Sequence, residues 1–251
     1  YDALEFRVDR RLSKNYFFNA SYTWSRLFGN YSGLASSDEA GRSSPNVNRF
    51  FDLPFLGWTA DGAPDNGRLA TDRPHVFKAY AGYNFTWGGS KSHSTDFAVF
   101  TTAQSGTPLT TTYSLFQVTS AILNGRGDLG RTERFTETDL LVSHKYRFGA
   151  DSRMTFEPYI NIRNLFDQDA ELTRQTQYGL SNISDGALRA VGCVACTNEV
   201  TTIQQIFNGG IRSLVLARLD GNKAARVFNT YNLANSFQAP REVRFGARLY
   251  F

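Results

Sequence analysis

The sequence predicts an all-β protein whose strands form part of an antiparallel transmembrane β-barrel. Three observations support this prediction: apolar and polar residues alternate in seven segments, short and long connections alternate between them, and the final strand ends on an aromatic residue, Phe251. Aromatic residues make up 14% of the chain, and there are 21 glycines but a single methionine. This composition favours strands and turns over helices.

Alternation with a period of two places successive side chains on opposite faces of a strand. In the last segment Val243, Phe245 and Leu249 share one face, whereas Arg244 and Arg248 share the other. The seven predicted strands cover residues 3–12, 16–28, 73–86, 94–105, 135–148, 153–166 and 241–251.

Two further features qualify this list of strands. Pro158 falls inside the sixth strand, where it removes a ladder donor, so we expect a bulge or a local irregularity there. Residues 211–219, inside the longest loop, could form a strand of their own.

The connections alternate in length, as they do in barrels with tight periplasmic turns and long extracellular loops. Residues 13–15, 87–93 and 149–152 form short turns, and residues 29–72, 106–134 and 167–239 form long loops. The last strand must run inward from outside so that the C-terminus is periplasmic. Counting the strands back from it makes every long loop extracellular. Aromatic side chains near strand ends fit an interfacial girdle; they are Tyr16, Trp24, Trp87 and Tyr146.

A soluble β-sandwich is the alternative, because periodicity alone does not show which face meets water. The long loops, uncommon in compact soluble domains, and the aromatic strand ends favour the membrane. An odd number of strands cannot close a bacterial barrel. We therefore expect either an eighth strand near Ile211 or, as preferred, the last third of a larger barrel. The abrupt start at Tyr1, without an initiator methionine or signal segment, suggests that an N-terminal part is missing.

The charged parity of the strands is predicted to face the lumen. Charged lumens are ordinary in such barrels, so a charge-paired wall is favoured over a substrate lining. The lumen-facing candidates are Glu5, Arg7, Asp9, Glu137, Asp139, Lys145, Arg147, Glu157, Arg163, Glu242, Arg244 and Arg248.

The last strand also resembles the terminal signal that outer-membrane barrel proteins present to the barrel-assembly machinery. In that signal a polar residue, a glycine, a hydrophobic residue and a terminal aromatic residue recur at fixed spacing. The matching residues here are Arg244, Gly246, Leu249 and Phe251.

Few residues suggest chemistry. No glutamate or cysteine completes a metal set with the three histidines, His75, His93 and His144, and no catalytic motif appears, so we expect neither an enzyme nor a cofactor. The net charge is +4, but the charged residues are scattered along the chain, which argues against binding of nucleic acid.

Two loop segments have possible chemical roles. Cys193 and Cys196 are expected to form a local disulfide on the cell surface, with a redox or metal role as the alternative. Residues 61–67 carry oxygens that could hold calcium, although a turn is favoured.

Several segments resemble Oar-like TonB-dependent outer-membrane proteins of Gram-negative bacteria. They are residues 31–52 (YSGLASSDEAGRSSPNVNRFFD), 71–80 (TDRPHVFKAY), 105–109 (SGTPL) and 159–167 (YINIRNLFD), together with the terminal strand. The resemblance covers essentially the whole chain. It implies that residues 1–251 are the C-terminal segment of a 22-stranded barrel, preceded by a plug that carries the TonB box and by a small β domain.

The same resemblance implies energised transport of a peptide-like, protein-like or other substrate through a plugged barrel. Expected partners are outer-membrane lipid, the TonB energy complex acting through the missing plug, and an unknown substrate. A surface adhesion or scaffold protein that binds a neighbour through its loops is the alternative function. A passive porin, with an open lumen and no plug, is a third.

Overall fold

A single antiparallel sheet of seven strands forms the larger part of the protein. The structure is a computed structural model and describes residues 1–30, 54–89, 92–116, 118–148 and 154–251. The strands lie in the order β1-β2-β5-β6-β9-β10-β13, and the sheet is open, with β1 and β13 at its edges. They span Asp2–Ser13 (β1), Tyr16–Arg26 (β2), His75–Thr86 (β5), His93–Gln104 (β6), Phe135–Phe148 (β9), Met154–Arg163 (β10) and Glu242–Tyr250 (β13).

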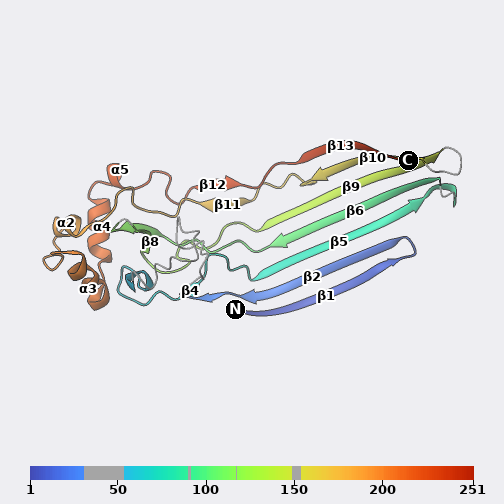
Figure 1. The fold of residues 1–251 in the computed structure, drawn as a ribbon. Coiled ribbons are helices and arrows are strands. Elements are labelled where there is room, and N and C mark those ends of the chain that lie inside the picture. The colour runs from blue at the N-terminus through green and yellow to red at the C-terminus, as the bar shows by residue number, and fades with distance from the viewer. Residues whose placement is uncertain (31–53, 90–91, 117, 149–153) are drawn as a thin grey trace.

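All seven strands expected from the alternation are present, each with bounds within about three residues of the prediction. The two described short connections lie at one end of the sheet and the long connections at the other (Figure 1). Lys14 and Asn15 close the first hairpin with φ of 51° and 73°, the left-handed pair that a two-residue turn requires. The expected turn at 149–152 and the family motif at 31–52 lie outside the described residues.

One face of the sheet, called here the apolar face, is formed in every strand by the alternate positions that carry mainly apolar residues. No second layer covers it among the described residues: Phe245 is 80% exposed and Leu249 is 51% exposed. Phe6 on β1, Trp24 on β2 and Phe156 on β10 are also exposed. A water-soluble sandwich would bury this parity, so the sheet has the inverted construction of a wall that meets lipid.

Pro158 does not produce a bulge, but it does produce a local irregularity, the second form that the sequence prediction allowed. The ladder from β10 to β13 runs without a break through the pair Pro158–Ala247. The ladder to β9 omits Glu157 and Pro158 and then resumes in the same register at Tyr159. Because proline lacks only its own N–H, the missing bond interrupts one ladder locally without shifting the strand.

The long connections fold together into a cap, defined as residues 54–69, 107–131 and 168–238. Figure 1 shows it beyond one end of the sheet. It contains three small antiparallel pairs, two of them wholly within the cap, and several helices; none of the described helices is long and apolar enough to cross a membrane. The pairs are β3 (Phe28–Gly29) with β4 (Gly67–Arg68), β7 (Thr112–Leu115) with β8 (Val118–Ile122), and β11 (Glu171–Arg174) with β12 (Ala234–Phe237). The helices are η1 (Pro54–Gly57), α2 (Asp185–Arg189), α3 (Glu199–Gly209), α4 (Arg212–Asp220) and α5 (Lys223–Arg226), and η2 (Trp87–Gly89) lies in a short turn of the sheet.

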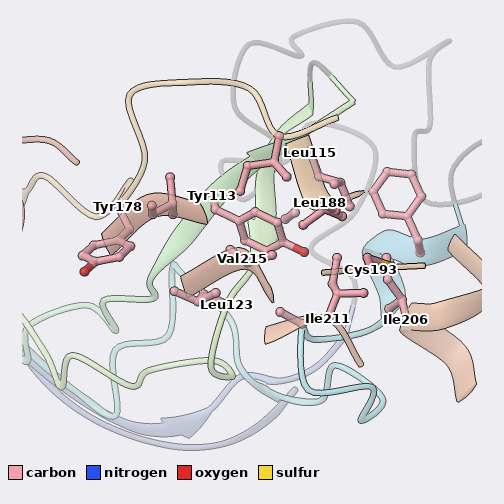
Figure 2. Packing of buried hydrophobic residues seen from close by; sticks show 14 of the residues in the cluster. Tyr113, Leu115, Leu123, Tyr178, Leu188, Cys193, Ile206, Ile211 and Val215 are labelled. Atoms are coloured by element: carbon pink, nitrogen blue, oxygen red, sulfur yellow. The ribbon is translucent and has the colours of Figure 1, made fainter. Parts of the chain in front are cut away.

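The described hydrophobic core lies in the cap and not in the sheet. Leu115 comes from the second connection, and Ile183, Leu188 and Val215 come from the third; all four are at most 1% exposed. Figure 2 shows Leu115, Leu188 and Val215 gathered in one cluster, to which Ile183 also belongs. The three connections are thus one packed unit, because each supplies side chains to the same core.

Residues 211–219 form most of α4 and not a strand, which corrects the sequence prediction. Ile211, Val215 and Leu219 are spaced by four residues and are 0%, 0% and 1% exposed. This spacing places them on one helical face, directed into the cap core.

Candidate functional site: the charged face and the cap

The twelve lumen-facing candidates lie on the same face of the sheet, called here the charged face. Cross-strand pairs in the register connect them: Glu157 lies opposite Arg248, and Arg163 lies opposite Glu242. The same parity continues through Ser143 on β9 and Asp96 on β6, which are also partners. These positions therefore share one face from β13 to β6.

Opposite charges on this face are arranged as neighbours. Lys145 Nζ lies 2.7 Å from Asp96 Oδ2, and Arg248 Nη1 lies 3.6 Å from Glu157 Oε1. Near one edge, Glu242 accepts two hydrogen bonds from Arg244, at 2.7 and 2.9 Å. These contacts make the charged face a wall of paired ions, as expected for a surface that faces water or another protein domain.

The remaining candidates divide between the ends of the sheet. Asp139 Oδ1 accepts the backbone N–H of Asn164 at 2.9 Å, and Glu137 lies 3.4 Å from the Gln238 amide. Glu137 therefore contacts the cap, whereas Asp139 holds the end of β10 from which the third connection begins. Glu5, Arg7 and Asp9 are exposed on β1, and Arg147 is exposed near the turn end of β9.

A buried carboxylate joins the first two long connections to the sheet. Asp72 is fully buried, and its Oδ1 accepts the backbone N–H of Leu27 at 2.6 Å. Arg131, from the second connection, donates to Asp72 Oδ2 and also to the carbonyls of Asp72 and Gly106, at 2.9 and 2.8 Å. Arg68 completes the cluster at 3.4 Å.

The pKa of Asp72 is lowered by this arrangement. Burial of the carboxyl is the largest single influence and raises the pKa. The Leu27 hydrogen bond, the Arg131 hydrogen bond and the charges of Arg68 and Arg131 together outweigh it. The carboxylate therefore stays ionised at neutral pH and holds three chain segments together.

A second anchor holds the third connection, through Asn164 at the end of β10. Asn164 Nδ2 donates to the carbonyls of Gln168 and Ala239, at 2.8 and 2.9 Å, and its Oδ1 accepts the Gln168 N–H at 2.9 Å. Its φ of 49° is left-handed, a conformation that asparagine tolerates better than most residues. One side chain thus fixes both ends of a connection of more than 70 residues, and it belongs to the 159–167 motif.

Inside the cap, hydrogen bonds between side chains also hold the long connections together. Tyr178 OH donates to Asp220 Oδ1 at 2.5 Å, and burial followed by this carboxylate raises the pKa of Tyr178 to about 12. Burial likewise raises the pKa of Tyr113. Thr111 and Tyr231 share a hydrogen bond of 2.7 Å between their hydroxyls. The phenols remain neutral at physiological pH and act as hydrogen-bonding groups.

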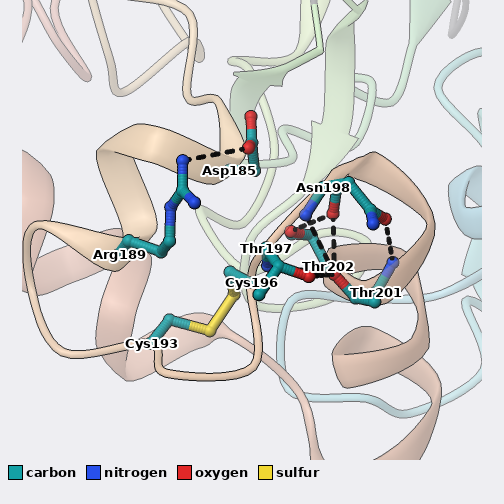
Figure 3. Close-up of a disulfide and its surroundings, with 8 residues drawn as sticks. All are labelled: Asp185, Arg189, Cys193, Cys196, Thr197, Asn198, Thr201 and Thr202. Carbon is teal, nitrogen blue, oxygen red and sulfur yellow. Dashed lines mark hydrogen bonds and ion pairs between the residues drawn. A yellow bond between two sulfur atoms is a disulfide. The ribbon is translucent and has the colours of Figure 1, made fainter.

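Cys193 and Cys196 form a disulfide in the structure, with Cα atoms 5.4 Å apart. Figure 3 shows it between α2 and the start of α3, beside Asn198. Asn198 caps α3, accepting the Thr201 N–H, while the Thr201 hydroxyl accepts the Asn198 N–H in return. Val194 between the cysteines is 90% exposed, whereas Cys196 is fully buried. The bridge therefore pins an exposed apolar tip to the cap core.

The possible calcium segment is a turn. Gly62 adopts a φ of 80°, and Thr59 N–H donates to the Ala63 carbonyl at 2.8 Å. Asp65 is fully buried and paired with Arg126 at 2.8 Å, so this carboxylate is already engaged by a cation. In the part of the chain that the structure describes, no cluster of three or more His, Cys, Asp or Glu residues could hold a metal ion.

The histidines lie on the apolar parity of the sheet. His75 Nδ1 lies 2.8 Å from Tyr22 OH, and His144 Nδ1 lies 2.9 Å from Thr95 Oγ1. His93 packs on Tyr146, with ring centroids 4.7 Å apart. They contribute polar, aromatic contacts near the ends of the strands.

Sequence reasoning missed the two anchors. Asp72, Arg131 and Asn164 lie outside the alternating segments or at their ends, so periodicity gave them no role. The available signals were weak: an Asp-Arg-Pro before β5 and an Asn at the end of β10. Both signals lie within the motifs that carry the family resemblance, at residues 71–80 and 159–167.

An open sheet with an exposed apolar face, a charge-paired second face and long connections at one end defines a β-barrel wall of the outer-membrane type. The family model described as "Outer membrane beta barrel domain" matches residues 1–201, and the chain belongs to this family. The protein is also similar to the TonB-dependent transporter Oar of Myxococcus xanthus, with 30% identity over 254 residues. That match covers 100% of this chain but 22% of the relative's length. No solved structure matches the chain.

Proposed function

We propose that this chain is the C-terminal barrel segment of an Oar-like TonB-dependent transporter, with a non-catalytic role in moving a peptide-like, protein-like or other substrate across the outer membrane. The similarity over the whole chain to a protein named as a TonB-dependent transporter supports this proposal. The single structural observation that carries it is the inverted sheet bearing a folded cap at one end. A complete barrel of 22 strands, with a plug inside, belongs to the proposal.

In this proposal the charged face looks into the lumen. The paired ions, such as Arg248 with Glu157, present a polar surface against which a plug domain can pack and move. Pairing lowers the cost of a charged wall, because each charge keeps a partner when water is displaced. The cap would face outward and capture the substrate, and the residues Arg244, Gly246, Leu249 and Phe251 would be read by the barrel-assembly machinery.

The orientation has a direct test on cells that express the full-length protein. A cysteine introduced at exposed Val194 in the cap and one introduced at Lys14 in the first turn are labelled with a membrane-impermeant maleimide. The proposal predicts labelling at position 194 on intact cells and at position 14 only after the outer membrane is opened. The reverse pattern would overturn the orientation.

The transport role is tested by cross-linking the full-length protein to the periplasmic domain of TonB. Energised transport predicts a specific cross-link from the plug, strengthened when substrate is present. Absence of a cross-link in the presence of a positive-control transporter would remove the transport proposal.

A surface adhesion or scaffold role is the second candidate, and one observation favours it. The cap has its own hydrophobic core, its disulfide-pinned tip exposes Val194 at 90%, and Val200 at the start of α3 is 75% exposed. A rigid projecting unit with an apolar tip suits contact with a neighbouring protein. This role predicts that replacing Val194 and Val200 with serine abolishes attachment of the partner while TonB cross-linking is absent in both forms.

A further inference from the structure

A shallow groove crosses the apolar face near the turn end of the sheet. Its volume is about 360 Å³, and Phe17 and Gly82 complete a lining drawn from three strands. Two cross-strand rows account for the rest: Tyr16, Tyr83 and Phe97 form one row, and Phe18, Ala81 and Val99 form the other.

The groove exists because the middle strand, β5, carries small side chains between larger ones. Ala81 lies between Phe18 and Val99, and the next row, Ala20, Ala79 and Thr101, is also small. A linear hydrocarbon chain fits a furrow of this kind, since it can lie over the small side chains and contact the aromatic row of Tyr16, Tyr83 and Phe97 along one side. The groove thus selects an elongated apolar occupant.

A cation lies at the end of one row. Arg10 on β1 is the register partner of Phe18, so it continues the row of Phe18, Ala81 and Val99. Its guanidinium carbon lies 4.1 Å from the centroid of the Tyr16 ring. Arg10 is thus the positive charge that interrupts the apolar parity of β1.

The guanidinium has unused hydrogen-bonding capacity. Arg10 Nε is buried and has no hydrogen-bond partner among the described residues. A buried donor left without an acceptor destabilises the protein, because the group has lost its hydrogen bond to water and gained no other. An anion that approached along the groove would satisfy it and gain a charge-assisted bond.

We propose that this groove is a glycerophospholipid site, in which the phosphate binds Arg10 and one acyl chain lies along Phe18, Ala81 and Val99. The phosphate diester is the anion that a membrane supplies beside an apolar chain, and Arg is suited to its geometry. Tyr16 and Tyr83 have the amphipathic rings that occupy the interface between head groups and acyl chains. The site rests on the proposed membrane segment but does not require transport, TonB or a substrate.

The test uses the full-length protein in detergent and native mass spectrometry with dioctanoyl-phosphatidylglycerol as the probe. Dioctanoylglycerol, which lacks the phosphate, and glycerol 3-phosphate, which lacks the chains, are the comparison ligands. We expect retention of the phospholipid and weak retention of both comparison ligands. Equal binding of dioctanoylglycerol would show that the phosphate is not recognised and would overturn the proposal.

Variants separate the two parts of the site. Arg10→Gln is expected to weaken phosphatidylglycerol binding about tenfold while leaving dioctanoylglycerol unchanged. Ala81→Leu fills the groove floor and is expected to weaken both lipids. The matched control is Arg11→Gln, which removes the same charge one residue away and is expected to change neither.

Two outcomes would overturn the site. One is unchanged binding in Arg10→Gln, as would follow if another part of the full-length protein pairs with Arg10. The other is an equal loss in Arg11→Gln, which would indicate a general effect of charge. Because the assay involves no transport, a failed TonB cross-link would leave a positive lipid result intact, and the two proposals can fail separately.

Discussion

The Tyr159 ring lies over Gly246, its register partner on the neighbouring strand β13. A Cβ atom at position 246 would lie 2.4 Å from the ring of Tyr159. Arg248 stacks on the same ring at 4.7 Å, so the glycine, the ring and the guanidinium form one unit on the charged face. Phe17 and Gly82 repeat the pairing between β2 and β5. Gly246 is predicted as part of an insertion signal; independently of that prediction, packing against Tyr159 requires a residue without a side chain at this position.

Gly246→Ala is expected to destabilise the folded sheet by about 1–3 kcal/mol, because the new methyl group displaces the Tyr159 ring from its place beside Arg248. Unfolding of the full-length protein in urea, followed by its altered migration on unheated gels, measures this change. In Tyr159→Ser the space is open, so adding Gly246→Ala to that variant should cost much less. An equal cost in both backgrounds would show that the ring contact is not responsible.

Asp72→Asn is expected to loosen the cap, because it removes the charge that Arg131 and Arg68 contact. The loss should be about 1.5–3 kcal/mol, the range for hydrogen bonds to charged groups. Hydrogen–deuterium exchange of peptides within residues 54–69 and 107–131 measures it.

The same residue gives the wild-type cap a pH dependence. The pKa of Asp72 is lowered in the folded state, so its contribution is complete above the unfolded pKa of about 4 and disappears as the pH falls through the folded value. Exchange in the cap should rise below about pH 4 in the wild type and show a smaller step in Asp72→Asn. An identical acid profile in the two proteins would contradict the assignment.

Asn164→Ala should release the base of the third connection. It removes three hydrogen bonds at a left-handed position, with an expected cost of about 2–4 kcal/mol. Limited proteolysis should then cut within residues 168–239 faster than in the wild type. Asn161→Ala on the charged face of the same strand is the control, and an equal acceleration there would remove the anchor role.

The disulfide is expected to resist reduction until the cap opens, since Cys196 is fully buried and Cys193 is 6% exposed. Mass analysis after reductant and alkylation should find both thiols protected in native protein and modified after urea. Cys193→Ser together with Cys196→Ser should destabilise the cap by about 2 kcal/mol, the entropy of closing so short a loop. Free thiols in native protein kept under oxidising conditions would contradict the bridge.

The strands could be predicted because their signal is local. In β13 the alternation of Val243, Arg244 and Phe245 depends only on neighbouring positions. A face that meets lipid requires apolar residues at every second position, so the alternation is regular. Even residues 94–105, where Phe100 interrupts the polar side of the alternation, appear as β6 within one residue. The charged parity followed from the same rule.

The cap could not be predicted in this way, because its core depends on distant contacts. Leu115 and Ile183 meet although 68 positions separate them, and only their packing makes the loops one unit. The sequence of α4 is compatible with a strand because a short apolar run fits either a strand or a helix, although Ile211, Val215 and Leu219 have the four-residue spacing of a helix. Asp72 and Asn164 could not be predicted as anchors, because the sequence does not show which distant residues come within hydrogen-bonding distance of them.

Site-directed spin labelling along β13 tests most directly whether the apolar face meets lipid. Labels at positions 243, 244, 245, 248 and 249 of the full-length protein in lipid bilayers are compared for collision with oxygen, which concentrates in lipid, and with a water-soluble nickel chelate. The account predicts that positions 243, 245 and 249 collide with oxygen, whereas positions 244 and 248 do not. Loss of this alternation, or oxygen access at 244 and 248, would contradict the central claim.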